Sequence, residues 1–594
     1  MEFLFYNNRC LSLLICILVA ICNVGCASTH NYAVRSKASS QIERMGKRYV
    51  VKGVLDLDGT TLTLPRNVVF DCREGVIKNG KIVGSGNRIL YLNPFLDEGV
   101  TITGCYVDDN TLYSKDILVH NHFSNVDIHN VYNLAKSGAN IVFEEGTYKR
   151  VTQIDITKDI TLDFSNSTIE TAIDQYELSS SVFMTEVSPA KRLKNVTIKN
   201  VVIDGKLPRY GLESGGGPRR NAIRLMDVEN VTLENVTIKN FRQGTSGYYD
   251  KDVKKRHMAG VCAIFGYTNC TITNSSLSMC TGEGFYLVPI DNNQNYTEFT
   301  HNKSIHNYGT FLTLVDGKCL VEDNYLEKFG LSGFNLFCYN SIIRNNRFKD
   351  GEKFNCIDIT ENGLYWPRNV EISGNDAERC DGFIMVSGEK ITIKNNKSKS
   401  PLSGFALTIY GYSKTTDASS EYLIQRGSCG GAVSVSVENN EFDCKGGIAT
   451  YNGCKGDLKI TRNIISVIPD EEGKAFRGSA IELFDCQSVI IDENTFNDSF
   501  RNSITRSNVY ITLKGCSGDM VIKNNQFNRT RKTPDQASYF LFTEGTSLDR
   551  LTIENNDANV KGITVRAVEG RIPVKGTRKV RANGIIIDKT AALE

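Results

Sequence analysis

One pattern of four residues returns along the chain: Phe299-Thr300-His301-Asn302, then Val321-Glu322-Asp323-Asn324, then Ile343-Arg344-Asn345-Asn346. Later copies end at Asn375, Asn396, Asn440, Asn463, Asn494, Asn525 and Asn556. Successive asparagines lie 22, 22, 29, 21, 44, 23, 31, 31 and 31 residues apart. A fixed offset at a variable period is typical of a solenoid whose coils share one corner. Asparagine suits that corner because it tolerates left-handed backbone and its amide can bond to the next coil.

A second column of apolar residues returns every 22 to 26 residues, at Phe285, Phe311, Phe334, Ile357, Phe383 and Phe405. Each opens an alternating run, as in Phe334-Asn335-Leu336, which places Phe334 and Leu336 on one face and Asn335 on the other. The coils are too short for a crossover helix and are rich in Ile, Val, Phe and Thr. The two columns predict an all-β protein, a right-handed, single-stranded parallel β-helix.

The coils begin at a segment that reads Gly138-Ala139-Asn140-Ile141-Val142-Phe143-Glu144-Glu145-Gly146-Thr147-Tyr148. This segment resembles the first coil of the pectate-lyase superfamily, in which a glycine, an apolar strand and a Gly-x-Tyr turn open the helix. The resemblance implies a β-helix over residues 138–594. It leaves activity open, because that superfamily holds polysaccharide lyases, glycoside hydrolases, esterases and binding proteins. Residues 27–137 carry short β-like runs broken by Asp-Gly and Asn-Gly corners, and we expect them to form a cap.

Residues 1–26 have the features of an export signal. Arg9 precedes an apolar run that is too short to span a membrane, and Gly25-Cys26 resembles the end of a bacterial lipoprotein signal. We therefore expect an exported protein at the cell surface, the outer membrane or the periplasm, anchored through a lipid on Cys26. Plain secretion after cleavage near Ala27 is the alternative.

The cysteines and histidines show no metal-binding spacing. Fourteen of the 18 cysteines follow the signal, none forms a CxxC pair, and several, such as Cys262, fall at inward positions. We expect buried free thiols rather than a disulfide framework. His120, His122 and His129 with Asp127 are better read as a solvated face than as a metal site. The sequence predicts no metal ligand and leaves a calcium requirement open.

Two long interruptions together carry more net positive charge than the whole chain. Residues 207–220 have a balance of +2 and residues 242–257 a balance of +3, in a chain whose total is +2. Insertions in a solenoid map to loops off the stack, often on its binding face. We therefore expect a polyanion to be attracted to this part of the chain, through Arg219, Arg220, Lys255 and Arg256.

The outward positions of the alternating column predict a strip of side chains along one sheet: Arg224, Ala263, Tyr286, Leu312, Asn335, Asp358, Ile384 and Ala406. A lyase acting on a uronic-acid polymer must neutralise a carboxylate, remove a proton and protonate a leaving oxygen. We predict Arg224, His257, Tyr286 and Glu283 as the catalytic residues. Asn335, Asp358, Glu361 and Trp366 are expected to contact substrate.

Three classes of function remain open. A lyase for an anionic polysaccharide is preferred. A glycoside hydrolase would use a carboxylate pair drawn from Glu283, Asp358, Glu361 and Asp381. A glycan-binding surface protein would use the same basic face without cleavage, and each candidate side chain could instead be an ordinary solvated residue. We expect a monomer with no nucleic-acid partner, and membrane contact only through the lipid anchor.

Overall fold

The computed structural model divides into two compact units, Met1–Ile154 with Lys158–Glu170 and Asp155–Thr157 with Thr171–Glu594. It describes residues 41–90, 100–107, 116–119, 121, 125–171, 181–185, 192–206, 221–241, 260–290, 294–360, 367–399, 405–411, 432–467, 479–497, 500–501, 508–528, 538–547, 550–558, 563–564, 580–582 and 585–587. The predicted signal and Cys26 lie outside these residues.

The first unit contains a small, mostly parallel sheet. Its strands are β1 (Gln41–Met45), β2 (Arg48–Asp56), β3 (Thr61–Thr63), β4 (Val69–Lys78), β5 (Gly80–Leu90) and β6 (Val100–Val107). Only β1 runs antiparallel to its neighbour. Phe70, Ile77 and Ile82 are fully buried in its core. The sequence therefore places the β-like runs of this region correctly.

One helix, α2 (Asn125–Leu134), was missed by the sequence analysis. Asn130 on α2 accepts a hydrogen bond from the backbone nitrogen of Ile102 at 2.8 Å, so the helix covers the edge of β6. Lys158 donates from Nζ to the carbonyls of Tyr132 at 2.9 Å and Ala135 at 2.7 Å, at the carboxyl end of the helix. Burial lowers the pKa of Lys158 to about 8.

The rest of the first unit consists of β7 (Asp116–Val119), β8 (Ala139–Phe143), β9 (Thr147–Val151), the start of β10 (Ile154–Asp155) and most of β11 (Ile160–Thr171). Strands β7, β8 and β11 pair in parallel. His129 bonds to Thr152 Oγ1 at 3.0 Å through Nε2, as an ordinary polar side chain would. His120 and His122 lie outside the described residues.

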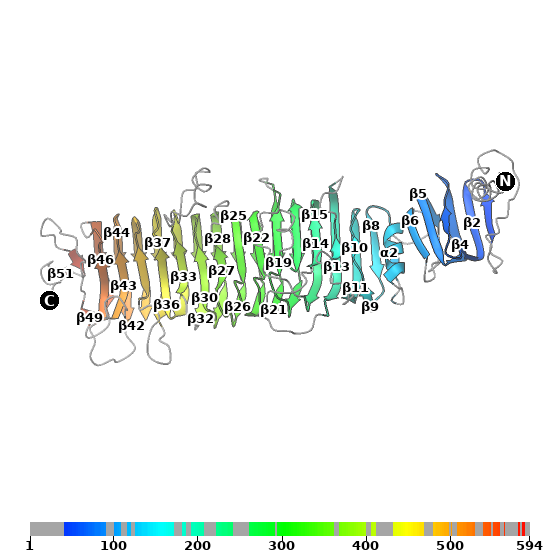
Figure 1. Cartoon of the computed structure of the whole chain (residues 1–594). Helices are drawn as coiled ribbons and strands as arrows, with labels where there is room; N and C mark the ends of the chain where they lie inside the picture. Colours follow the sequence, from blue (N-terminus) through cyan, green and yellow to red (C-terminus); the bar gives the residue numbers. More distant parts are fainter. Residues whose placement is uncertain are drawn as a thin grey trace, which may run out of the picture. The chain divides into compact units, whose positions relative to one another are not determined.

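The second unit is a right-handed parallel β-helix, in which strands from successive coils stack in parallel on three faces (Figure 1). The first face is made of β12 (Ser181–Met184), β14 (Asn221–Met226), β16 (Cys262–Tyr267), β19 (Phe285–Pro289), β22 (Leu312–Gly317), β25 (Phe334–Arg344), β27 (Asn355–Ile359), β30 (Gly382–Val386), β33 (Phe405–Tyr410), β36 (Gly446–Tyr451), β39 (Ile481–Phe484), β43 (Asn508–Lys514), β46 (Ser538–Glu544) and β49 (Ile563–Thr564).

The second face is made of β13 (Leu193–Asp204), β15 (Val228–Lys239), β17 (Asn269–Thr273), β20 (Tyr296–Thr300), β23 (Cys319–Glu322), the end of β25, β28 (Arg368–Ser373), β31 (Glu389–Lys394), β34 (Val435–Glu438), β37 (Asp457–Thr461), β40 (Ser488–Asp492), β44 (Met520–Lys523) and β47 (Leu551–Glu554). The third face is made of the ends of β13 and β15, with β18 (Ser276–Ser278), β21 (Lys303–Asn307), β24 (Tyr325–Phe329), β26 (Arg347–Lys349), β29 (Asp376–Glu378), β32 (Lys397–Lys399), β35 (Glu441–Cys444), β38 (Ile464–Val467), β41 (Thr495–Asn497), β45 (Gln526–Asn528) and β48 (Asp557–Ala558).

Two short pairs complete the strands of this unit. Strand β42 (Phe500–Arg501) runs antiparallel to β43, and β50 (Val580–Ala582) pairs antiparallel with β51 (Ile585–Ile587).

The predicted asparagines form a continuous ladder between the second and third faces. The side-chain oxygen of Asn346 accepts from the backbone nitrogen of Asn324 at 3.0 Å and from its Nδ2 at 2.8 Å, and the same pair of bonds links Asn346 to Asn375. Each of the remaining asparagines repeats the backbone bond, from Asn302 to Asn556. The predicted stacking is confirmed.

The left-handed residue of each corner is not the ladder asparagine. It is the residue before it, for example His301 at φ 57°, Asp323 at 55° and Asn345 at 56°. The ladder asparagine instead keeps its amide turned inward, where burial strengthens its hydrogen bonds. The role that the sequence analysis gave to asparagine was therefore right for the bonding and wrong for the backbone.

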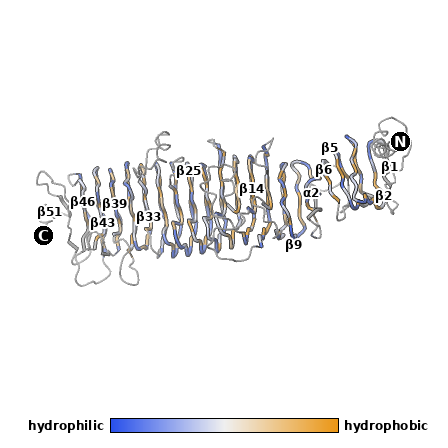
Figure 2. The backbone as a smooth tube through the Cα atoms, viewed as in Figure 1, coloured by the Kyte–Doolittle hydropathy of each residue, from blue (hydrophilic) through white to orange (hydrophobic). Residues whose placement is uncertain are grey.

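Apolar side chains from all three faces fill the inside of the coils. Phe334 and Ile357 are register partners, and both are fully buried, as predicted. Figure 2 shows hydrophobic and hydrophilic segments alternating along the coils. The 13 cysteines among the described residues are all free and buried, which confirms the prediction of apolar thiols for that part of the chain.

Candidate functional site

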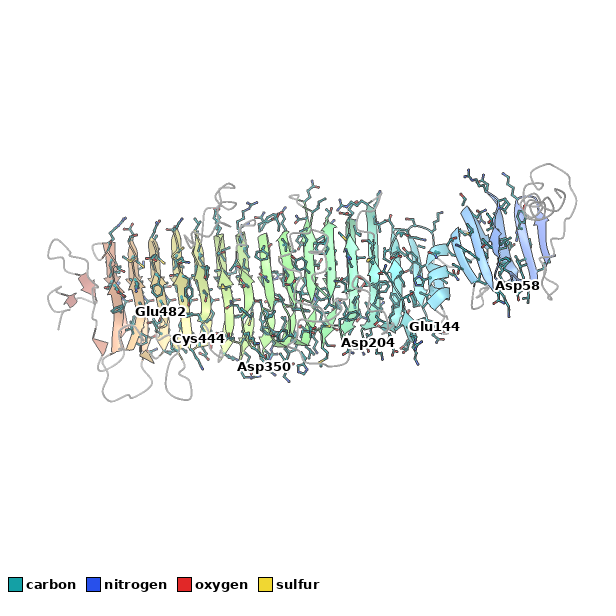
Figure 3. All side chains as sticks on the ribbon, viewed as in Figure 1. Asp58, Glu144, Asp204, Asp350, Cys444 and Glu482 are labelled. Atoms are coloured by element: carbon teal, nitrogen blue, oxygen red, sulfur yellow. The ribbon has the colours of Figure 1, made fainter. Side chains whose placement is uncertain are left out.

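The first face carries an outward row in which one residue from each coil faces away from the core. Starting from Arg224, the register partners are Ala263, Tyr286, Thr313, Asn335, Asp358, Met385, Thr408, Ala449, Glu482 and Thr512. We call this set the Arg224 row; Glu482, one of its members, is labelled in Figure 3. Neighbours in the row are separated by ~4.8 Å, the spacing of paired strands.

Three predicted members of the row are wrong. Leu312 and Ile384 point inward and are fully buried, because they pair with Phe285 and Ile357 of the inner column. Each follows a buried phenylalanine. Where two apolar residues stand next to each other, the alternating pattern does not show which of them belongs to the inner column. The third wrong prediction is Ala406. The residue of this coil that belongs to the Arg224 row is Thr408, two residues later. The row members missed by the sequence analysis next to the predicted site are Thr313 and Met385.

Arg224 is a buried cation on the outside of the coil. Its side chain on β14 is 5% exposed, and burial lowers its pKa. Its Nη2 lies 3.8 Å from the sulfur of Met226, a weak acceptor, and its Nε has no hydrogen-bond partner. Within the described coils, no carboxylate forms an ion pair with it. A guanidinium held in this way is stabilised by an incoming anion.

Tyr286 lies two coils from Arg224, at ~10 Å along the row. It packs against an outward cluster of Met226, Ala263 and Phe265, and its ring centroid is 5.8 Å from that of Phe265. Gly260 allows this position, because a Cβ there would lie 2.7 Å from the Cβ of Tyr286, and its φ is +90°. Two residues of the predicted catalytic set therefore flank one small residue, Ala263.

The other described members of the predicted site lie on both sides of Tyr286. Glu283 is half-buried in the corner before β19, three residues ahead of Tyr286, or ~10 Å along the strand. Asn335 is half-buried and follows Thr313 in the row. Thr313 is fully buried although it faces outward, and its hydroxyl has no hydrogen-bond partner.

Asp358 stands next to Asn335 at the far end of the predicted site. Burial raises its pKa to about 6, a hydrogen bond from Thr360 acts in the opposite direction, and its Oδ1 has no hydrogen-bond partner. Asp381, a candidate partner carboxylate, also has a raised pKa because of burial. It lies on the next coil and four residues from the row position at Met385, or ~14 Å from Asp358.

The remaining predicted residues, Arg219, Arg220, Lys255, Arg256, His257, Glu361 and Trp366, lie outside the described residues. Their roles stay predictions. The described part of the chain has no cluster of three His, Cys, Asp or Glu side chains that could hold a metal ion, and no helix of a length and hydrophobicity that would cross a membrane.

The raised pKa of Asp358 predicts a pH-dependent effect of Asp358→Asn on stability. An unfolded aspartate ionises near pH 4, whereas folded Asp358 ionises near pH 6, so the wild type loses stability as the pH rises through this window. The variant should therefore raise the stability by about 2 kcal/mol at pH 7.5 and have little effect at pH 4. Melting temperatures at both values measure this difference.

Asp350→Asn is the control with the opposite sign. Arg379 donates from Nε to Asp350 Oδ1 at 2.7 Å and holds the pKa of that carboxyl below its usual value. This variant should lower the melting temperature at neutral pH. A loss of stability for both variants at neutral pH would contradict the account of Asp358.

Among the comparisons with known proteins, a family model supports the architecture of part of the chain. A family model described as "Right handed beta helix region" matches residues 221–398, and no curated protein matches the sequence. Among solved structures, the Streptococcus pneumoniae surface adhesin PfbA is 13% identical, with a TM-score of 0.37, and the alignment covers 79% of this chain and 95% of the adhesin.

Two enzymes give similar values. A Yersinia enterocolitica family 28 exopolygalacturonase is 10% identical, with a TM-score of 0.30 and coverage of 76% of this chain and 79% of the enzyme. A PL6 alginate lyase bound to a trisaccharide is 14% identical, with a TM-score of 0.32 and coverage of 81% and 93%. An adhesin, a hydrolase and a lyase at these values do not distinguish between activities. Residues 221–398 form a right-handed β-helix region, by sequence model and by structure alike.

Proposed function

We propose that this protein binds an anionic, uronic-acid-containing polysaccharide along the Arg224 row and cleaves it by β-elimination. The observation that carries the proposal is the guanidinium of Arg224, which is 5% exposed and has no carboxylate partner among the described residues. Burying a charge without a partner costs several kcal/mol. A structural arginine would be expected to avoid that cost by pairing, and a substrate carboxylate supplies the missing charge.

Arg224 would bind the C6 carboxylate of the uronate with two parallel hydrogen bonds. This neutralisation makes the C5 proton more acidic and stabilises the negative charge that develops when the proton leaves. The electron pair of the C5–H bond then forms a double bond between C4 and C5, while the C4–O4 bond breaks and the leaving oxygen takes a proton. We assign to Tyr286, two coils away in the same row, the transfer of the C5 proton to the leaving oxygen.

His257 and Glu283 remain further candidates for the proton transfer. His257 would share the basic segment that precedes β16, and Glu283 lies in the corner before the strand of Tyr286. We place the basic residues Arg219, Arg220, Lys255 and Arg256 around the same substrate, where they would increase its rate of association.

A glycoside hydrolase is the second candidate, because Asp358 has a pKa of about 6 and could act as a general acid. Such enzymes need a second carboxylate within ~5–9.5 Å. The backbone positions of Asp358 and Asp381 are ~14 Å apart, so we do not assign Asp381 as that second group. Glu361 would have to supply the second group, so the lyase mechanism is favoured.

The proposed location is outside the cytoplasm, with the chain anchored through a lipid on Cys26. This proposal is supported by the signal-like residues 1–26 and by buried thiols, which would be protected from external oxidants.

The direct test is incubation of the purified protein with a panel of acidic and neutral polysaccharides. A lyase produces unsaturated uronates, which are detected by ultraviolet absorbance, whereas a hydrolase produces reducing ends without that absorbance. We expect absorbance with an acidic polymer, and its strong reduction in Tyr286→Phe. Reducing ends alone would favour Asp358 as a general acid, and binding without either product would favour a glycan-binding protein.

A further inference from the structure

Charge is distributed unevenly along the Arg224 row. Arg224 follows Met184 of β12, and the next four members, Ala263, Tyr286, Thr313 and Asn335, carry no charge. The fifth step reaches the carboxyl group of Asp358, at ~24 Å from Arg224. A polysaccharide bound along the Arg224 row therefore contacts a cation at Arg224 and a carboxyl group at Asp358.

The polar groups near Asp358 have unused hydrogen-bonding capacity. Oδ1 of Asp358 has no hydrogen-bond partner, and neither does the hydroxyl of Thr313, two coils away. Within the described residues, Asp358 forms no ion pair. Its register neighbours are Asn335 and Met385, neither of which titrates. Buried polar atoms of this kind gain most from a ligand that completes their hydrogen bonds.

Arg224 and Asp358 favour different chemical groups on a bound sugar. A sugar hydroxyl can donate to the Asp358 carboxylate, and it can also accept from the half-buried Asn335. An ionised uronate has only acceptor oxygens on its carboxylate and would be repelled by Asp358. A homopolymer of uronates cannot satisfy both residues if its carboxylates face the protein.

The spacing of the coils limits which sugars can lie at Arg224 and at Asp358. A pyranose unit in an extended chain is about as long as one coil step, ~5 Å, so successive sugars can lie over successive coils. Five steps separate Arg224 from Asp358, and five is odd. In a polymer that alternates charged and uncharged sugars, a uronate at Arg224 therefore places an uncharged sugar at Asp358.

We propose that the substrate is a heteropolysaccharide in which the uronate bound at Arg224 is followed, at Asp358, by an uncharged sugar held through its hydroxyl groups. This inference rests on the proposed function and specifies the substrate class of the same site. Asp358 then acts as a specificity residue that disfavours polymers with a carboxylate on every sugar.

The test measures dissociation constants at neutral pH for the full-length protein and for Asp358→Asn. The probes are two groups of polymers. Hyaluronan, unsulfated chondroitin and heparosan alternate a uronate with an uncharged amino sugar, whereas polygalacturonate, polymannuronate and polyguluronate carry a carboxylate on every sugar. We expect the wild type to bind at least one alternating polymer about tenfold more tightly than any homopolymer.

Asp358→Asn should abolish this preference, mainly by strengthening homopolymer binding about tenfold. Asp350→Asn is the matched control: it removes a carboxylate from the corner after β26, away from the row, and should leave the preference intact. A wild type that binds a homopolymer as tightly as the alternating polymers would overturn this inference alone, and so would equal effects of Asp358→Asn on both groups. Failure to bind any uronate polymer would overturn the proposed function as well.

Discussion

Arg224→Met is expected to reduce kcat/KM for the anionic polysaccharide by at least about 100-fold. The methionine matches the stem of the arginine as far as Nε and would lie beside Met226, whose sulfur already contacts the guanidinium at 3.8 Å. It cannot bind a carboxylate. The loss should appear in substrate affinity and in turnover, because Arg224 would hold both the ground-state carboxylate and the charge that develops on it.

The same variant should keep or raise the melting temperature. The wild-type side chain is a buried charge without an ion-pair partner among the described residues, and replacing it with an apolar group removes the cost of desolvation. Arg224→Lys should recover part of the binding, since lysine restores the charge without the planar fork. An inactive variant with a much lower melting temperature would instead indicate a structural arginine. Full activity would remove Arg224 from the site.

Arg379→Ala is the control for a general effect of removing positive charge. Arg379 lies beyond the third-face strand β29 and pairs with Asp350 at 2.7 Å. Its loss should leave the kinetics unchanged at moderate salt. A loss of activity comparable with that of Arg224→Met would mean that the net field of the protein, rather than the row, attracts the substrate.

Asn346→Leu is expected to destabilise the coils around it by about 3 kcal/mol. The side chain accepts two hydrogen bonds from Asn324 and donates to Asn375 and to the carbonyl of Val321. Leucine fills a similar volume and leaves the buried backbone nitrogen of Asn324 and the carbonyl of Val321 unpaired. That penalty is larger than the net gain of a typical hydrogen bond.

Asn269→Leu makes the same chemical change on the surface. Asn269 is exposed and donates to Asn230 at 2.8 Å, so its replacement should change the stability by less than about 0.5 kcal/mol. Hydrogen exchange read coil by coil is the suitable measurement, because long repeat proteins do not unfold in one step. Faster exchange at β23, β25 and β28, with unchanged exchange at β43, is expected. Equal effects of the two substitutions would contradict the role of the ladder.

The sequence predicts the architecture because each repeat is a short segment that ends in the same residue, asparagine. A buried asparagine with satisfied bonds on both sides tolerates no substitute of similar shape, so all ten predicted asparagines, from Asn302 to Asn556, lie in the ladder. The outward row is specified less strictly. Phe311-Leu312 and Phe383-Ile384 are each two buried apolar residues in succession, and alternation cannot show which of them joins the inner column. The helix α2 was missed because its residues carry only a weak helical pattern.

The candidate site depends on information that a sequence does not carry. The burial of the outward-facing Arg224 and the unsatisfied atoms of Thr313 and Asp358 depend on the three-dimensional surroundings of each side chain. The signal that could have identified Thr313 was its place in Leu312-Thr313-Leu314, where the threonine has the outward parity.

Because of the asparagine ladder, distances along the β-helix can change in steps of one whole coil. Because each asparagine contacts only its neighbours, a coil such as residues 325–346 could be lost or duplicated in evolution while Asn324 finds an equivalent partner on the next coil. Such an event would change the separation of Arg224 and Asp358 by one coil, ~4.8 Å. In an alternating polymer bound at Arg224, the sugar at Asp358 would then be a charged one instead of an uncharged one. Proteins built on this plan can therefore change which polymer they accept by changing their length, without substituting Arg224 or Asp358.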